Sequence, residues 1–197
     1  MATKVTICSN ALMLLGDAAI ANFEEGTKRA TLCANLYPIA KADILRRHPW
    51  NCLQKRVVLS PRSDTPPFGP TKWFDPPGDL LRVIAVSTGG CPLDYAYEGG
   101  RILCDTSILQ LQYLTDATEG DWDSNLVNVM VKRMEMDLAY PITKSTSLAD
   151  SLAQKFYARG NGVLAVSKAV DGQENQNEQF GDSPFLQVRD GLSRGAW

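Results

Sequence analysis

Apolar residues recur every three or four positions in the first part of the chain, as is typical of amphipathic helices. Between residues 5 and 15 they form one face and Gly16 follows as a stop signal, so the pattern predicts a helix over about 3–16. A second helix is expected over about 27–48, where Pro38 predicts a kink or a division. This segment carries two apolar stripes side by side, which indicates a helix contacted on more than one side.

The period of the pattern changes from 3.6 to 2 in the middle of the chain, which predicts a small antiparallel sheet over about 54–116. A strand is expected at 81–86, and a tight hairpin turn at 98–101, where two glycines separate apolar runs. Residues 109–113 alternate leucine or tyrosine with glutamine, so this strand should have one buried face. The strands are expected to form a meander. Six of the 11 prolines fall between Pro61 and Pro77 and predict a long surface loop.

Helical spacing returns after the sheet and predicts two more helices. The third covers about 123–141, begins at Asp123 or Ser124 as N-cap, and is closed by a proline. The fourth covers about 147–171 and opens with a capping-box motif. Its apolar positions keep one phase across the glycines of 160–162, so one long helix with a weak point is favoured over a break. The expected core comprises Leu12, Leu15, Leu36, Ile44, Val127, Met130, Met134, Leu152 and Phe156.

Beyond residue 171 a run of Gln, Asn and Glu is followed by isolated apolar residues, which cannot form a core among themselves. We expect this segment, 172–197, to be an extended arm that orders on a partner, with terminal fraying as the alternative. Its candidate binding residues are Phe180, Phe185, Leu186, Val188, Arg189 and Trp197. The whole pattern predicts an α+β fold: a four-helix bundle from 1–53 and 117–171, an inserted small antiparallel β-sheet domain with a Pro-rich loop at 54–116, and the extended C-terminal arm.

Composition excludes several classes of protein. The 197 residues include 20 Lys and Arg against 22 Asp and Glu, a net charge of −2, which argues against a protein that wraps nucleic acid. The longest unbroken apolar run is about five residues, too short to span a membrane. The 5 cysteines form no Cys-x-x-Cys pair and the chain has 1 His. Neither a zinc site nor a disulfide framework is expected, and buried free thiols in a reducing cytoplasm are favoured.

Three groups of polar side chains are candidates for chemistry, and each also has a structural interpretation. Glu24 and Glu25 form a carboxylate pair, but adjacent residues point apart, and both precede a helix whose N-terminus favours negative charge. Asp121 and Asp123 have the same interpretation before the third helix. His48, the sole histidine, stands at a helix C-terminus, where a cation offsets the exposed carbonyl groups. The structural interpretation is favoured for both carboxylate pairs, and nothing in the sequence nominates a catalytic residue.

A basic segment with an aromatic residue inside it is the other candidate. Arg46, Arg47, Lys55 and Arg56, with Trp50 between them, are residues of the kind that contact a phosphate backbone. A solvated helix end with one anchoring tryptophan explains them equally well, so both interpretations stay open. A protein through which DNA only slides avoids a strongly basic lining, which agrees with the slightly acidic composition.

The order of these parts resembles the tail tubular protein A family of short-tailed bacteriophages. The resemblance covers roughly residues 5–190, and its most specific part is the His-Pro-Trp segment at 48–50 that follows the Asn-Leu-Tyr-Pro of 35–38. The matching segments are 8–12 with 15–16, 34–38, 45–51, 76–83, 138–143 and 165–174. The glycines at 160–162 depart from the family pattern and put the continuity of the fourth helix in question.

The resemblance implies a structural role without catalytic residues, metal or cofactor. Proteins of this family form a ring, usually a dodecamer, between the portal protein of the capsid and the tail nozzle protein, with tail fibres as a further candidate partner. They act as head-to-tail adaptors in the virion tail, assembled in the cytoplasm of the host bacterium, and no membrane is involved. They close the DNA-filled head and conduct genomic DNA at ejection without sequence-specific binding. The C-terminal arm is the expected portal-binding segment. A virion-associated peptidoglycan hydrolase, acting through Glu24 or Glu25, is the alternative.

Overall fold

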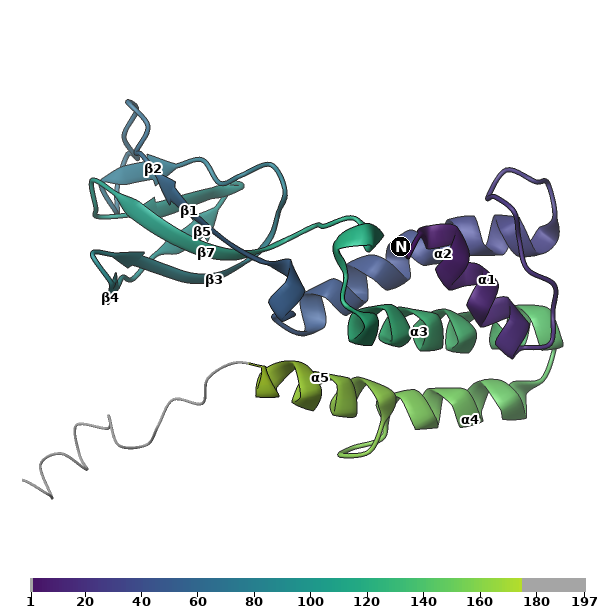
Figure 1. Ribbon diagram of the computed structural model, residues 1–197. Coiled ribbons are helices and arrows are strands. Elements are labelled where there is room, and N and C mark those ends of the chain that lie inside the picture. The colour runs from purple at the N-terminus through teal and green to yellow at the C-terminus, as the bar shows by residue number, and fades with distance from the viewer. Residues whose placement is uncertain (1, 175–197) are drawn as a thin grey trace, which may run out of the picture.

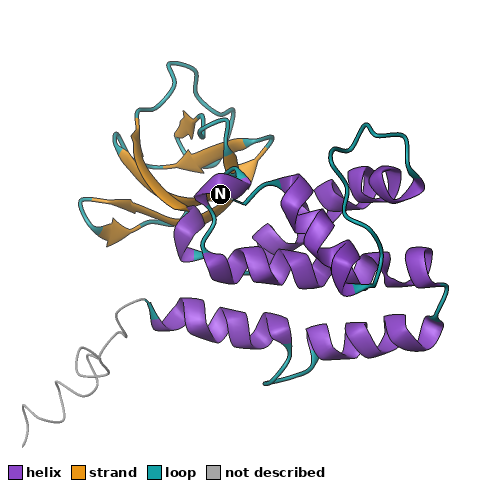
Figure 2. Ribbon diagram, turned by 45° about the vertical axis from the view of Figure 1, so that its right-hand side comes forward, coloured by secondary structure: helices purple, strands orange, loops and turns teal. Residues whose placement is uncertain are grey.

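A computed structural model of the chain describes residues 2–174. Within that range the fold is mixed α+β, with the helices gathered in one part of the molecule and the strands in another (Figures 1 and 2). The helices are α1 (Lys4–Leu14), α2 (Lys28–Arg47), α3 (Ser124–Thr143), α4 (Thr146–Tyr157) and α5 (Val163–Gln173), with short 3₁₀ turns η1 (Asn51–Leu53) and η2 (Glu119–Asp121). The strands are β1 (Gln54–Leu59), β2 (Lys72–Phe74), β3 (Leu80–Thr88), β4 (Cys91–Pro92), β5 (Ala96–Glu98), β6 (Arg101–Cys104) and β7 (Leu109–Thr115).

The first three helices lie where the apolar period predicts them, and side-chain caps fix where each begins. Thr3 and Thr6 form a capping box at the start of α1, and the Thr27 hydroxyl accepts the Ala30 N–H at the start of α2. Asp123 is confirmed as the N-cap of α3. Pro38 does not divide α2, which continues as one helix from Lys28 to Arg47.

The end of α3 and the start of α4 differ from the prediction. Pro141 does not close α3, which runs on to Thr143, where the threonine hydroxyl donates to the Ala139 carbonyl at 2.7 Å. The turn then comes at Lys144, whose backbone is left-handed with φ +61°. The N-cap of α4 is therefore Ser145 rather than Ser147, because the Ser145 hydroxyl is the one that accepts the Leu148 N–H.

The predicted single helix over 147–171 is wrong, because the chain breaks between α4 and α5. Gly160 has φ +82°, a conformation that side chains disfavour. A Cβ at Gly162 would lie 2.5 Å from the Ala158 carbonyl oxygen, so only glycine fits there. The helical spacing of apolar residues continues across the break because Phe156 in α4 and Leu164 in α5 both face the core. The described residues hold five α-helices instead of the predicted four.

The strands form two antiparallel sheets rather than one meander. The first has the order β1-β7-β3-β4 and the second β2-β6-β5. The predicted hairpin is confirmed between β5 and β6, where Gly99 and Gly100 both have positive φ. The Pro-rich segment is not wholly a loop, since it contains β2, which pairs with β6. The last strand in the sequence, β7, lies between β1 and β3, and most of its residues are buried.

Two apolar cores hold the structure together. The larger joins all five helices, and the smaller lies in the strand region. Of the predicted core, the fully buried residues are Leu12, Ile44, Met130, Met134 and Phe156. The partly buried ones are Leu15, Leu36, Val127 and Leu152. None of the helices within residues 2–174 is long and apolar enough to cross a membrane.

Candidate functional site

The ends of three helices meet where the helical part joins the strands, and this junction contains the His-Pro-Trp segment. His48 follows α2, Asn51 opens η1, Asp123 precedes α3, and Asp171 lies in the last turn of α5. These residues are far apart in the sequence, so periodicity alone does not bring them together. We call this group, together with Glu174, the α5 junction.

Asp171 is the centre of the α5 junction. Its side chain is 1% exposed. One carboxylate oxygen lies 2.8 Å from His48 Nε2, and the other accepts the Asn51 backbone N–H at 3.1 Å. The Asn51 side-chain amide donates to the Asp171 carbonyl at 2.6 Å. These contacts of Asp171 tie the end of α5 to the segment after α2. The sequence interpretation of His48 as a charge at a helix end missed this partner.

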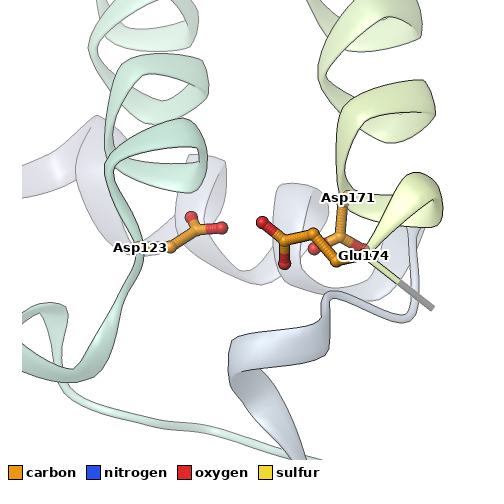
Figure 3. A group of neighbouring side chains, drawn as sticks. All are labelled: Asp123, Asp171 and Glu174. Atoms are coloured by element: carbon orange, nitrogen blue, oxygen red, sulfur yellow. The ribbon is translucent and has the colours of Figure 1, made fainter.

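Three carboxylates come together at the α5 junction. One oxygen from each of Asp123, Asp171 and Glu174 lies within 4.8 Å of the others (Figure 3). Oxygen groups of this kind are the ligands that hard divalent cations prefer. Two of the three are already engaged, however: Asp171 with His48, and Asp123 with the Leu126 N–H at 2.6 Å. The arrangement is accounted for by helix capping and by the attachment of α5.

The structure decides between the two interpretations of the basic segment around Trp50. The Trp50 ring is fully buried, and its indole N–H donates to the Ile44 carbonyl at 3.1 Å. A buried ring cannot stack on a nucleic-acid base, so the aromatic half of the phosphate-binding hypothesis is wrong. Trp50 anchors the end of α2. Arg47 is likewise engaged, with Asp43 at 2.8 Å.

The candidate carboxylates before the helices have structural partners. Glu25 accepts the Thr27 hydroxyl at 2.6 Å and the Ala21 N–H at 2.9 Å. These hydrogen bonds, that of Thr27 above all, lower the pKa of Glu25. A general acid needs the opposite, a raised pKa that keeps its proton at neutral pH. Glu25 therefore fits the structural interpretation, while Glu24 is exposed beside it.

A second polar group at the base of the sheet was not predicted. Asp79, just before β3, accepts hydrogen bonds from Lys55 Nζ at 2.9 Å, from Thr115 Oγ1 at 2.8 Å and from the Tyr113 hydroxyl at 3.1 Å. The Lys55 ammonium and then the Thr115 hydroxyl are the main causes that lower the pKa of Asp79 to about 2. These bonds fasten β1, β3 and β7 to one another where they leave the helices.

The structure leaves apolar side chains uncovered on several helices. Ile39 on α2 is 66% exposed. Met13 and Leu14, at the end of α1, line a groove of about 480 Å³ together with Val127 and Val131 of α3. On α5 the large apolar side chains of Val166 and Val170 are exposed. These faces belong to helices whose other sides are in the core.

The predicted arm residues lie outside the part of the chain that the structure describes. These are Phe180, Phe185, Leu186, Val188, Arg189 and Trp197. Gly172 and Gln173, which the prediction assigns to the arm, belong to α5. The described part of the chain ends at Glu174, at the α5 junction.

Comparison with known proteins adds nothing to this picture. No model of a known protein family matches the chain, and no curated protein is significantly similar to it. Any function proposed for the chain therefore rests on its own residues.

Proposed function

We propose that the protein is a head-to-tail adaptor of a short-tailed bacteriophage virion. In this proposal copies of the chain form a ring between the portal and tail nozzle proteins, and the resemblance implies a dodecamer. The ring closes the DNA-filled head and conducts the genome at ejection, and the virion tail is its location. The protein then works through its surfaces, not through a catalytic group.

The observation that carries the proposal is the role of the His-Pro-Trp segment. This segment is the most specific part of the resemblance, and in the structure it is the part that holds the end of α5. His48 and Asn51 both bind Asp171, one turn before residues 175–197 begin. A segment that binds a partner loses less free energy on binding when its attachment point is fixed beforehand. The α5 junction supplies such a fixed point for the proposed portal-binding arm.

The uncovered apolar faces support assembly. Large apolar side chains at Ile39, Met13 and Leu14 are each more than half exposed. Contiguous exposed apolar surface is typical of protein–protein interfaces. A ring of identical copies requires each copy to contact two neighbours through different surfaces, and exposed apolar side chains on α1 and α2 are available for such contacts.

The proposal is tested by mixing the purified protein with purified portal rings and examining the mixture by electron microscopy. We expect an added ring of density, coaxial with the portal, that is absent from either component alone. Portal rings that remain bare over a wide range of protein concentration would contradict the proposal. Release of soluble fragments from purified peptidoglycan, lost on Glu24→Gln or Glu25→Gln, would favour the hydrolase alternative instead.

A further inference from the structure

Three cations near the end of α2 have no carboxylate partner within the part of the chain that the structure describes. Arg46 is exposed at the end of α2, and its carbonyl accepts a hydrogen bond from Arg82 Nη1 of β3 at 3.0 Å. Lys168 of α5 is near Arg47, and burial followed by the charge of Arg47 lowers the pKa of Lys168. Among residues 2–174, no carboxylate forms an ion pair with Arg46, Arg82 or Lys168. We call these three residues the basic surface.

The sheet extends the basic surface. Arg82 of β3 is opposite Leu114 of β7, which is opposite Gln54 of β1. Residues opposite each other in neighbouring strands share a face, and so do residues two apart along a strand. Arg56, two residues after Gln54, is therefore on the same face as Arg82. It is exposed and also has no carboxylate partner in the described chain.

The acidic loop, residues 116–121, carries an excess of the opposite charge. Asp116 and Glu119 share one cation, Lys41, at 3.1 and 3.4 Å. The Asp121 carboxylate accepts only the Thr118 hydroxyl within the described range, at 2.8 Å. Asp116 and Asp121 are both exposed. Three carboxylates with one ammonium group leave this loop negative.

The basic surface and the acidic loop lie on opposite sides of the molecule. On α2, Lys41 points to the loop, while Arg46 follows five residues later, about 140° around the helix axis. On β1, Lys55 pairs with Asp79, whose backbone carbonyl accepts the Asp116 N–H of the acidic loop at 2.9 Å. Arg56 is the next residue along β1 and points to the other face. In Figure 1 the green turn between β7 and α3 lies above α3, and α5 lies below α3.

We propose that the basic surface of one copy docks on the acidic loop of a second copy. Complementary charges on opposite sides of one chain are the arrangement for head-to-tail contact, which closes into a ring when the rotation between copies allows it. The proposal rests on the proposed function in so far as that ring is the adaptor. The partner is a second copy because the same chain carries the matching surface.

The test is a charge exchange in the full-length protein. The acidic variant carries Arg46→Glu with Lys168→Glu, and the basic variant carries Asp116→Lys with Asp121→Lys. Self-association is measured by sedimentation velocity over a concentration series at about 0.05 and 0.5 M salt, where screening differs strongly. We expect the wild type to associate at low salt, with each variant alone at least about tenfold weaker because like charges then face each other. An equimolar mixture of the two variants should recover association.

Lys28→Glu with Lys144→Glu is the matched control. It changes the net charge as the acidic variant does, and Lys28 lies about 27 Å from Arg46 along α2. We expect it to associate like the wild type. The mixture also controls for folding, because misfolded variants would not recover.

Three results would overturn the inference. The first is a wild type that stays monomeric at low salt, and the second is a mixture no better than its components. The third is salt-dependent binding of a duplex DNA oligonucleotide that the acidic variant loses while its self-association is unaffected. In that case the basic surface binds nucleic acid and not a second copy. Each of these leaves the portal-binding test of the proposed function undecided, and bare portal rings beside a self-associating wild type would reject that function alone.

Discussion

His48 Nε2 lies 2.8 Å from a carboxylate oxygen of Asp171, although 123 residues separate them in the sequence. The contact joins the segment after α2 to the last turn of α5, and so links the second helix to the last one in the described chain. The His-Pro-Trp segment therefore has a structural role, because its histidine holds the end of α5. A histidine and an asparagine so placed hold the last turn of α5 against the segment after α2.

Replacement of the buried carboxylate should loosen this junction. Asp171→Ala leaves the His48 ring and the Asn51 N–H without their acceptor, and we expect a loss of about 2–3 kcal/mol in the free energy of unfolding. Asp171→Asn keeps one oxygen acceptor and should lose less. The measurement is urea denaturation, with exposed Asp150→Ala as control. Equal effects at positions 171 and 150 would show that the junction adds no stability.

Trp50 should matter for stability and not for nucleic-acid binding. Trp50→Phe removes the hydrogen bond to the Ile44 carbonyl and leaves a small cavity, and we expect a loss of about 1–3 kcal/mol. Trp73→Phe, at a half-buried position in β2, should cost less. Both are measured by chemical denaturation alongside binding of a duplex DNA oligonucleotide. A variant of normal stability that loses DNA binding at position 50 would restore the phosphate-binding hypothesis.

The break between α4 and α5 can be tested by replacing two glycines with alanine, because one replacement should destabilise the fold and the other should stabilise it. In Gly162→Ala the new methyl group would lie 2.5 Å from the Ala158 carbonyl oxygen, so we expect the free energy of unfolding to fall by about 1–3 kcal/mol. Gly172→Ala meets no atom within 4 Å in α5 and should stabilise the helix by up to about 1 kcal/mol. Thermal melting of both variants checks the signs. A stabilising Gly162→Ala would mean that one continuous helix forms after all.

Acid should weaken the base of the sheet through Asp79. The pKa of this carboxyl falls from its ordinary 3.8 to about 2 in the fold, so its contribution to stability is fully present above about pH 3.8. The contribution is lost as the pH falls toward 2. We therefore expect the stability difference between wild type and Asp79→Asn to shrink over this range in urea titrations. A difference that stays constant from pH 5 to pH 2 would show that the ionised carboxylate is not what fastens the strands.

Local pattern predicts the helices of this fold better than its long-range contacts. The N-cap Asp123 and the hairpin glycines Gly99 and Gly100 act on neighbours in sequence, so the sequence pattern predicts them directly. The central place of β7 is different, because its pairing with β1 spans the whole inserted segment, while nearby strands turn away into a second sheet. Such non-local pairing leaves no periodic signal.

The α5 junction shows the same limit for the candidate site. His48 and Asn51 belong to a recognisable segment, yet their partner Asp171 is an ordinary acidic residue in a helix when seen alone. Apolar phase also misled the prediction across 160–162, because two helices in line on one core keep the same phase as one helix. The positive φ of Gly160 and the backbone contact at Gly162 decide the break, and both depend on the folded turn.

The central claim is that the protein attaches to the filled head through its C-terminal segment, and co-sedimentation with DNA-filled heads lacking this protein tests it most directly. Full-length protein is compared with Phe185→Ser/Trp197→Ser and with the matched polar control Gln176→Ser/Gln179→Ser. We predict that wild type and control sediment with the heads. The aromatic double variant should keep its melting temperature and stay in the supernatant, since aromatic anchors dominate interface energy. Undiminished sedimentation of that variant, or no sedimentation of the wild type, would contradict the claim.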